Sequence, residues 1–431
     1  MQRDVTRLRN IGILASVDAG TVTCRERIFE LIGGARTSEG EASLCGPLVG
    51  RGASPASSGT WTPRSGPFAE EPIALTFVAG LSRVLDGAVV VLDGARGTAE
   101  TADAALRDLC ARHVPCFVFI DDAGRIEDLE AMVDALELDL DVTAVPVQLP
   151  WNDERGTHVI DVLDQRLVVG PEGAGERALR PVPAEAQETI ARIRRRIVDI
   201  CAEGDERIHG ASMAGLDIGS DELARALRKA TLARDGRVLV VTCGSLRAGR
   251  GLGLLLDALV TYLPSPSDLP PVFGLDTRRS VTVARFAREG DALAATVFAT
   301  TDVPAVGRLT WLRIHSGIID VSATVTVLPR DTRGRIQRIF LPDVRGLLEV
   351  NNAGPGQVVC VTGAVDADVG DTISCARAPI LLDERHAGRR AGPPPVDVDG
   401  VAPRHTSTIW SVARSLQSVP VSSTGLRRSR G

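Results

Sequence analysis

The stretch "IGILASVDAGTVT", Ile11 to Thr23, decides the fold of the amino-terminal half of this 431-residue chain. A short apolar run leads into a glycine-containing turn, and a helical pattern follows over residues 25–32. This order is typical of a strand that enters a phosphate-binding loop at the start of a helix. Such a loop follows its last glycine with Lys and then Ser or Thr. Here Gly20 is followed by Thr21 and Val22.

Thr21 and Val22 remove two chemical functions from the loop. In a working loop, the lysine reaches the β- and γ-phosphates and the hydroxyl binds Mg²⁺. Val22 has no oxygen to offer a metal. The 49 Lys and Arg residues include a single lysine, Lys229, which lies in a distant helical pattern. The sequence therefore predicts no replacement for the missing lysine.

Alternation of apolar runs with helical patterns continues to about residue 271. Largely apolar runs of four to eight residues suit strands buried on both faces, and their alternation with helices predicts a parallel sheet. The expected strands are Ile11–Ala15, Ala88–Leu92, Cys116–Ile120, Val145–Leu149 and Val238–Thr242. The expected helices are Arg25–Ile32, Thr98–Arg112, Ile126–Leu136 and Gly253–Leu263, with a helical region over Ala184–Ala233. The Gly-, Ser- and Pro-rich stretch 43–71 is expected to be a long loop.

The hydrophobic pattern of the sequence changes after "YLPSPSDLPP", Tyr262–Pro271. The four prolines of this stretch indicate a domain boundary. From Ala292 to Leu382, short alternating runs are separated by Gly, Asp and Pro, which is typical of an all-β barrel or sandwich. After Gly400 there are five arginines and no acidic residue. We expect this end to be a disordered basic tail that either contacts acidic RNA or protein or has no role.

Composition limits the classes of function. The net charge of −6 argues against a protein devoted to bulk binding of nucleic acid, and we expect no DNA partner. No apolar run is long enough to span a membrane, and the first residues lack the apolar core of a signal peptide, so a cytoplasmic location is expected. None of the eight cysteines forms a C-x-x-C pair, which favours buried thiols over a zinc site.

Several motifs occur in one order and together resemble a known family. "RNIGILASVDAGTVTCRERI" resembles the start of bacterial elongation factor G, with the pattern R-N-I-G-I-x-A-H-V-D-A-G-K-T-T-x-x-E-R-I. "SRVLDGAVVVLDGARGTAETADAALRDLCARHVPCFVFID", "PVQLP", "ALRKATLA", "VTCGS" and "VGRLTWLRIHSGIID" follow in the family's order, so the resemblance covers about residues 8–382. It implies an α/β P-loop GTPase-like domain with a parallel sheet, then an all-β barrel. The implied boundaries are 1–271 (with a helical insert at about 161–233), 272–382 and a tail at 383–431.

The resemblance also implies a nucleotide site. The family binds GTP or GDP with Mg²⁺ and hydrolyses GTP on the ribosome, so the implied partner is the ribosome and the implied state is a monomer. The positions that match the family's nucleotide motifs are Asp18, Ala19, Gly20, Thr21, Val22, Thr23, Asp121, Asp122, Gly244 and Ser245.

The family's two switch motifs are poorly matched. Counting back from the Arg83 region places its D-T-P-G-H on residues 67–71, so that Glu71 takes the position of the water-positioning histidine. No register supplies the aspartate, because the chain has no Asp between Asp18 and Asp86. The first-switch R-G-I-T resembles residues 51–54, where Ser54 is a weak candidate for Mg²⁺; a chance "RG" in a loop is the alternative.

The guanine-reading N-K-x-D falls on Asp121–Gly124, or, with a two-residue shift, on Phe119–Asp122. In the shifted register Asp122 keeps a carboxylate for guanine; its alternative role is that of a turn residue. Both registers lack the Asn and the Lys. The loss of the lysine, the metal ligands and two base contacts removes more than about 6 kcal/mol, or over about four decades of affinity.

We therefore expect a truncated elongation factor G homologue with a degenerate site, acting as a ribosome- or translation-associated binding protein with weak or no GTP hydrolysis. Translocation by this chain alone is not expected, because it ends soon after Leu382. One alternative is an elongation or ribosomal-protection-type GTPase that retains hydrolysis through an atypical site. Another is a decaying gene copy.

Overall fold

The computed structural model describes residues 4–15, 24, 27–28, 30–32, 56–64, 66–78, 84–95, 106–110, 114–126, 128–154, 156–170, 178–233, 238–303, 306–343, 346–363 and 366–382. All of them belong to one compact unit, Met1–Arg390. The expected basic tail, 383–431, lies outside the described residues. Among the described helices, none is both long and apolar enough to cross a bilayer.

A mixed seven-stranded sheet forms the centre of the amino-terminal part, in the order β2-β3-β1-β4-β5-β11-β6. Its strands are β1 (Leu8–Ala15), β2 (Ala56–Trp61), β3 (Ile73–Val78), β4 (Gly87–Asp93), β5 (Cys116–Asp121), β6 (Thr143–Pro146) and β11 (Val238–Cys243). All neighbours pair in parallel except β2 and β3, which are antiparallel. The predicted parallel α/β sheet is confirmed.

Both faces of this sheet are buried, as the apolar runs predicted. In β4, Val89 and Val91 pack into one core cluster and Ala88, Val90 and Leu92 into another. Successive strand residues point to opposite faces, so a strand covered on both sides must be apolar throughout. Helix α3 (Leu129–Leu140) contributes to the second cluster, whereas α4 (Ala184–Gly204), α6 (Ser220–Leu232) and most of α7 (Leu252–Tyr262) contribute to the first.

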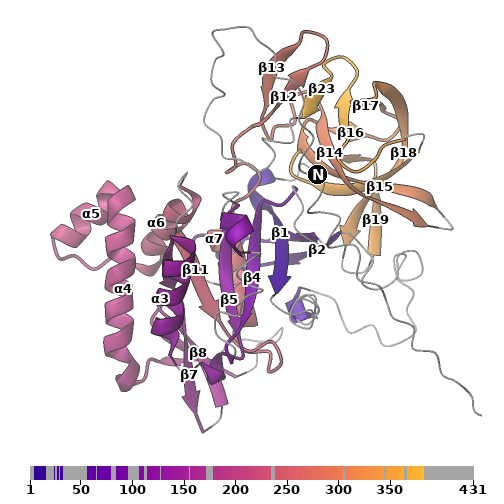
Figure 1. Ribbon diagram of the computed structural model, residues 1–431. Coiled ribbons are helices and arrows are strands. Elements are labelled where there is room, and N and C mark those ends of the chain that lie inside the picture. The colour runs from indigo at the N-terminus through magenta and orange to yellow at the C-terminus, as the bar shows by residue number, and fades with distance from the viewer. Residues whose placement is uncertain are drawn as a thin grey trace, which may run out of the picture. The chain divides into compact units, whose positions relative to one another are not determined.

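Helix α4 illustrates why these segments are helical. Ile190, Ile193 and Ile197 recur at three- and four-residue spacing, and all three are buried against the first cluster. Burial of each side chain is worth about 1.5–3 kcal/mol. The short helix α5 (Glu206–Met213) follows, and Figure 1 shows α4, α5 and α6 grouped beside the sheet.

A separate antiparallel sheet of four strands differs from two of the sequence expectations. Its order is β10-β9-β8-β7, with β7 at Gln148–Asp153, β8 at Gly156–Asp161, β9 at Arg166–Val169 and β10 at Ala178–Pro181. Region 161–233, expected to be helical, thus holds two strands before α4 begins. The single strand expected at Val145–Leu149 is in fact two strands in different sheets, β6 and β7, separated at Val147.

The expected long loop at 43–71 contains an edge strand. β2 pairs along its whole length with β3, from Ala56↔Val78 to Trp61↔Ile73. The sequence of this strand, ASSGTW, is polar, so no apolar run predicted it. An edge strand needs less apolar surface than a central one. The indole of Trp61 donates a hydrogen bond to Asp257 at 2.8 Å, which fixes the end of this strand against α7.

The remaining part is all-β, as expected. A seven-stranded sheet has the order β17-β22-β14-β15-β21-β18-β19, and an additional β17–β18 pairing closes six of these strands into a ring. Its strands are β14 (Ala294–Val303), β15 (Gly307–Ser316), β17 (Thr324–Leu328), β18 (Thr332–Asp343), β19 (Gly346–Val350), β21 (Val358–Gly363) and β22 (Thr372–Cys375). Closure removes exposed edges, so this is the predicted β-barrel. Figure 1 shows its strands in orange and yellow.

Shorter strands complete the barrel part. A three-stranded sheet joins β12 (Val272–Asp276), β13 (Val281–Arg285) and β23 (Ile380–Leu382), and a small pair joins β16 (Ile319–Asp320) to β20 (Asn352–Ala353).

One buried ion pair joins β15 to the segment before β4. The Arg313 guanidinium lies 2.7 Å from the Asp86 carboxylate, and both side chains are almost fully buried. Asn10 also donates to Asp86, and Arg313 donates to the carbonyl of Gly356. Burial raises the pKa of Asp86, while Arg313 and Asn10 act in the opposite direction.

Candidate functional site

The carboxyl ends of β1, β4, β5 and β11 meet at one edge of the central sheet. The registers place Asp93 of β4 opposite Asp121 of β5, and Cys243 of β11 opposite Ile120. In parallel α/β sheets, ligands bind at this edge. The loops that carry Asp121–Asp122 and Gly244–Ser245 are therefore neighbours, as the resemblance to a nucleotide site requires.

Asp121 ends β5 and holds the two loops together. Its Oδ1 accepts hydrogen bonds from the backbone N–H of Asp122 at 2.8 Å and of Leu246 at 2.7 Å. Its carbonyl accepts the N–H of Gly94 at 2.8 Å. Burial raises the pKa of Asp121, against the effect of the two donors. This carboxylate is a structural acceptor within the protein.

The Gly244–Ser245 loop is closed on itself. The N–H of Ser245 donates to the carbonyl of Arg250 at 2.9 Å, and the N–H of Arg250 donates back to Ser245 at 3.0 Å. A Cβ at Gly244 would lie 2.5 Å from the Arg250 carbonyl oxygen, so only glycine fits there. The N–H of Ala123 donates to the Gly244 carbonyl at 2.9 Å. These backbone donors are thus already engaged.

The β7–β8 hairpin covers Gly124. A Cβ at Gly124 would lie 2.0 Å from the hydroxyl oxygen of Thr157 and 3.1 Å from the amide oxygen of Asn152. The amide nitrogen of Asn152 also donates to the Gly124 carbonyl at 3.3 Å. A side chain at position 124 would therefore require Thr157 to move.

Asp122 is the remaining carboxylate of this loop. It adopts a left-handed conformation, with φ of 52°, and its side chain is partly exposed 3.9 Å from the Arg125 guanidinium. If the N-K-x-D motif is placed in the shifted register, the positions of the motif's Asn and Lys fall on Phe119 and Ile120. Both are fully buried strand residues. The unshifted register instead begins at Asp121, where the strand ends.

The described part of the helix that follows the phosphate loop lies beside the Gly244–Ser245 loop. Arg27 donates to the carbonyl of Arg247 at 3.3 Å. Burial raises the pKa of the Cys24 thiol to about 12, with a smaller contribution from the charge of Asp121. The predicted site residues Asp18–Thr23, and Ser54, lie outside the described residues.

Glu71 is placed differently from the sequence expectation. It precedes β3 and lies 3.5 Å from Arg7, which precedes β1. Because β1 and β3 are parallel, Glu71 lies at the amino-terminal edge of the sheet, opposite to the carboxyl edge where β1 ends. The assignment of Glu71 to the family's histidine position is therefore wrong. Counting residues back from Arg83 could not show that the strand β3 lies between Glu71 and the carboxyl edge of the sheet. Residues 79–83, which follow β3, lie outside the described residues.

The single lysine, Lys229, is occupied elsewhere. Its ammonium donates to the carbonyl of Gly204 at 2.8 Å and to the Asp205 carboxylate at 3.3 Å, at the end of α4. Among the residues that the structure describes, no group of three His, Cys, Asp or Glu side chains is arranged to hold a metal ion.

Sequence reasoning missed the two residues that close the loop, Asn152 and Thr157. They lie about thirty residues after Gly124, and no local pattern connects them to it, since the contact depends on how a hairpin packs. Arg250 was also missed, although the glycines on either side of it were a usable signal: Gly249 and Gly251 have φ of 65° and 77°.

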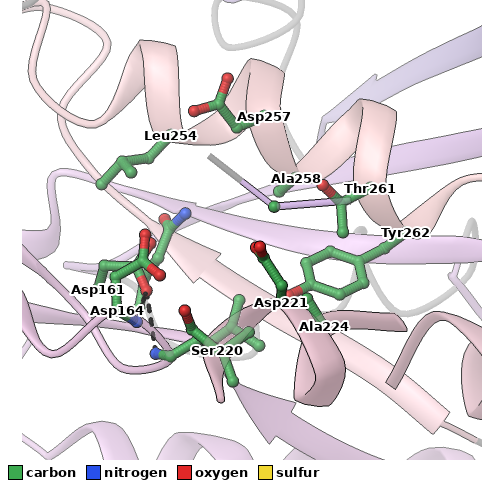
Figure 2. Close-up of a pocket in the computed structure, with 14 residues that line it drawn as sticks. Asp161, Asp164, Ser220, Asp221, Ala224, Leu254, Asp257, Ala258, Thr261 and Tyr262 are labelled. Atoms are coloured by element: carbon green, nitrogen blue, oxygen red, sulfur yellow. Dashed lines mark hydrogen bonds between the residues drawn. The ribbon is translucent and has the colours of Figure 1, made fainter. Parts of the chain in front are cut away.

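A small polar cavity of about 40 Å³ lies between the β7–β8 sheet, α6 and α7. Figure 2 shows the carboxyl groups of Asp161, Asp164 and Asp257 around it, with Tyr262 at one side. Asp161 accepts hydrogen bonds from the N–H groups of Leu163 at 2.9 Å and Asp164 at 3.0 Å. Burial, followed by repulsion from Asp164, raises the pKa of Asp161 to about 7.

Comparison with known proteins finds sequence relatives of one kind. The chain is 30% identical over 397 residues to elongation factor G of Thermotoga maritima, and equally to those of Thermotoga petrophila and a further Thermotoga species. Each alignment covers 88% of this chain and 57% of the relative, so the chain spans a little over half the length of these curated relatives. No family model matches the chain.

A solved structure from Thermus thermophilus shares the fold, with a TM-score of 0.67 at 18% identity, over 90% of this chain and 56% of that one. The sequence relatives, the α/β sheet followed by a closed barrel, and the motif order agree. Over the part that it shares with these relatives, the chain is similar in sequence to elongation factor G, and the solved structure shows the same fold.

Proposed function

We propose that this protein acts in translation as a ribosome-associated binding protein that hydrolyses GTP weakly or not at all. The observation that carries this proposal is the closed loop at Asp121–Gly124. A guanine-reading carboxylate in the unshifted register would stand at Gly124, where the hydroxyl of Thr157 occupies the space a Cβ needs. Asp121 and the N–H groups of Ser245 and Leu246 are already bonded within the protein. These contacts support the proposal that the loop does not accept a guanine base.

The phosphate side of the site supports the same proposal. Thr21 and Val22 replace the lysine and the metal-binding hydroxyl of the family's loop. β3, which lies beside β1, ends in Phe77 and Val78, neither of which offers a metal ligand. Hydrolysis of GTP needs a metal ion and a positioned water.

The retained fold suits a binding role. The central sheet and the barrel have well-buried cores that do not depend on the nucleotide loops. Loss of loop chemistry can leave stability unchanged or higher, since binding loops are not optimised for stability. We propose domains at 1–271 and 272–382, a monomeric state and a cytoplasmic location on the basis of the family resemblance.

Co-sedimentation with ribosomes tests the binding role. We expect the protein to pellet with ribosomes at low salt, to the same extent with GDP, with a non-hydrolysable GTP analogue or with neither. Protein that stays in the supernatant under all three conditions contradicts the proposal.

A second function, a GTPase with an atypical site, is favoured by one observation. Asp122 presents a partly exposed carboxylate beside the loop. A single-turnover assay of phosphate release on ribosomes separates the two functions, because only the GTPase releases phosphate above the ribosome-only background. An Asp122→Asn variant should abolish that release if the second function is correct, and should change nothing under the first.

A further inference from the structure

A groove lies between α3, α4 and the strand β7, and it borders the Asp121–Gly124 loop, because Asn152, which donates to the Gly124 carbonyl, is among its lining residues. It encloses about 610 Å³, within the range of about 300–1,000 Å³ typical of small-molecule pockets. Its walls include the buried apolar side chains of Val133, Leu149, Ile160 and Ile193. This apolar wall can contact the hydrophobic body of a ligand.

Trp151 adds an aromatic surface to the groove. It belongs to β7, is only half buried, and lines the groove together with Pro146 and Pro150. An indole face attracts a cation placed within about 6 Å of its centre, with about 0.5–2 kcal/mol of stabilisation depending on exposure to solvent.

The charges at the rim are mainly acidic. Asp128, Glu130, Asp134 and Glu185 line the groove, against the two arginines Arg192 and Arg196. Arg192 is paired with Glu130, and Arg196 with Glu137 of α3. With both arginines neutralised, the carboxylates of Asp128, Asp134 and Glu185 set the sign of the potential, and it is negative.

We propose that this groove binds an organic cation that combines a primary amine or guanidinium group with an aromatic or alkyl body of drug-like size. The body fills the apolar interior against Val133, Leu149 and Ile193. The cationic group lies at the acidic rim, within reach of the indole of Trp151. An anionic ligand of the same shape is rejected, because it meets the like charge of the carboxylates of Asp134 and Glu185 at the rim.

Three probes that share one body and differ in charge test this proposal: 4-phenylbutylamine, 4-phenylbutanol and 4-phenylbutanoate. Ligand-detected NMR titration of the full chain measures their affinities. We expect the amine to bind with a dissociation constant of about 1 mM or tighter, as its size permits. We expect the alcohol to bind about tenfold more weakly and the carboxylate not to bind, and raised salt to weaken only the amine.

Variants locate the binding. Asp134→Asn combined with Glu185→Gln should weaken the amine about fivefold and leave the alcohol unchanged, because it removes only rim charge. The matched control is Asp199→Asn with Glu203→Gln, two acids of α4 outside the groove, which should leave both affinities unchanged. Trp151→Leu should weaken the amine severalfold, with an unchanged circular dichroism spectrum as the check on folding.

Equal affinity for the amine and the alcohol overturns the proposal. The proposal is also overturned if the rim variant and the control variant weaken amine binding to the same extent. Absence of amine binding at several millimolar also overturns it. These outcomes are independent of nucleotide or ribosome binding, so they leave the proposed function untouched.

Discussion

Replacing Asp161 by Asn should make the protein more stable than the unaltered chain at pH 8, and this gain should shrink as the pH falls. Asp161 faces the cavity of Figure 2, where burial and the nearby carboxylates of Asp164 and Asp257 disfavour its charge. Its Oδ1 accepts two backbone hydrogen bonds, from Leu163 and Asp164. The amide oxygen of Asn can accept the same two bonds, so the substitution removes the charge and keeps the turn.

The magnitude follows from the difference between the two pKa values. Burial raises the pKa of this carboxyl to about 7 in the folded chain, from an ordinary value of 3.8. When the pKa of an acid is higher in the folded state than in the unfolded state, the folded state is favoured most at pH values below the unfolded-state pKa. This stabilisation is lost as the pH rises from the unfolded-state pKa to the folded-state pKa. At about 1.4 kcal/mol per pKa unit, the loss is about 4 kcal/mol in all, of which about 3 kcal/mol falls between pH 5 and pH 8.

Urea unfolding followed by far-ultraviolet circular dichroism at pH 5, 6.5 and 8 measures this effect. The free energy of unfolding of the variant minus that of the unaltered chain should rise by about 3 kcal/mol from pH 5 to pH 8. Asp139→Asn, which removes a carboxylate on the outer side of α3, is the control and should show no such rise. A difference that stays constant across the three pH values refutes the reasoning.

Two further predictions concern packing. Arg313→Met should lower the free energy of unfolding by about 3–5 kcal/mol, because it leaves the buried Asp86 carboxylate unpaired; chemical denaturation measures this, and adding Asp86→Asn should recover part of the loss. Gly124→Ala should cost about 1–3 kcal/mol, because its Cβ meets the Thr157 hydroxyl at 2.0 Å. In the double variant, Thr157→Ala should relieve most of that cost. If Gly124→Ala alone leaves the melting temperature unchanged, the β7–β8 hairpin does not close the loop.

The regular elements were largely predictable, because their apolar patterns are local. The Val-rich strand β4 and the isoleucine spacing of α4 carry their own periodicity. The polar edge strand β2 was missed for the opposite reason, since its pairing with β3 leaves almost no trace in its own sequence. α3 begins three residues later than expected, at Leu129, because the Asp128 side chain caps the helix by accepting the N–H of Ala131 at 3.0 Å.

The candidate site was predictable in identity but not in geometry. The motif order gave Asp121, Asp122, Gly244 and Ser245, and the structure brings these four positions together at one edge. The closure of Gly124 by Thr157 depends on a tertiary contact that no sequence pattern records. The misplacement of Glu71 has the same origin, since counting along the chain cannot tell which end of a strand a residue occupies.

Titration of the purified chain with a fluorescent GTP derivative in the presence of Mg²⁺ tests the central claim most directly. We expect no saturable binding at micromolar nucleotide, with or without Mg²⁺, and the same result for GDP. Saturable binding in the low micromolar range that requires Mg²⁺ and is competed by unlabelled GTP would contradict the account, because it would show that the loops after β1, β5 and β11 still form a guanine nucleotide site.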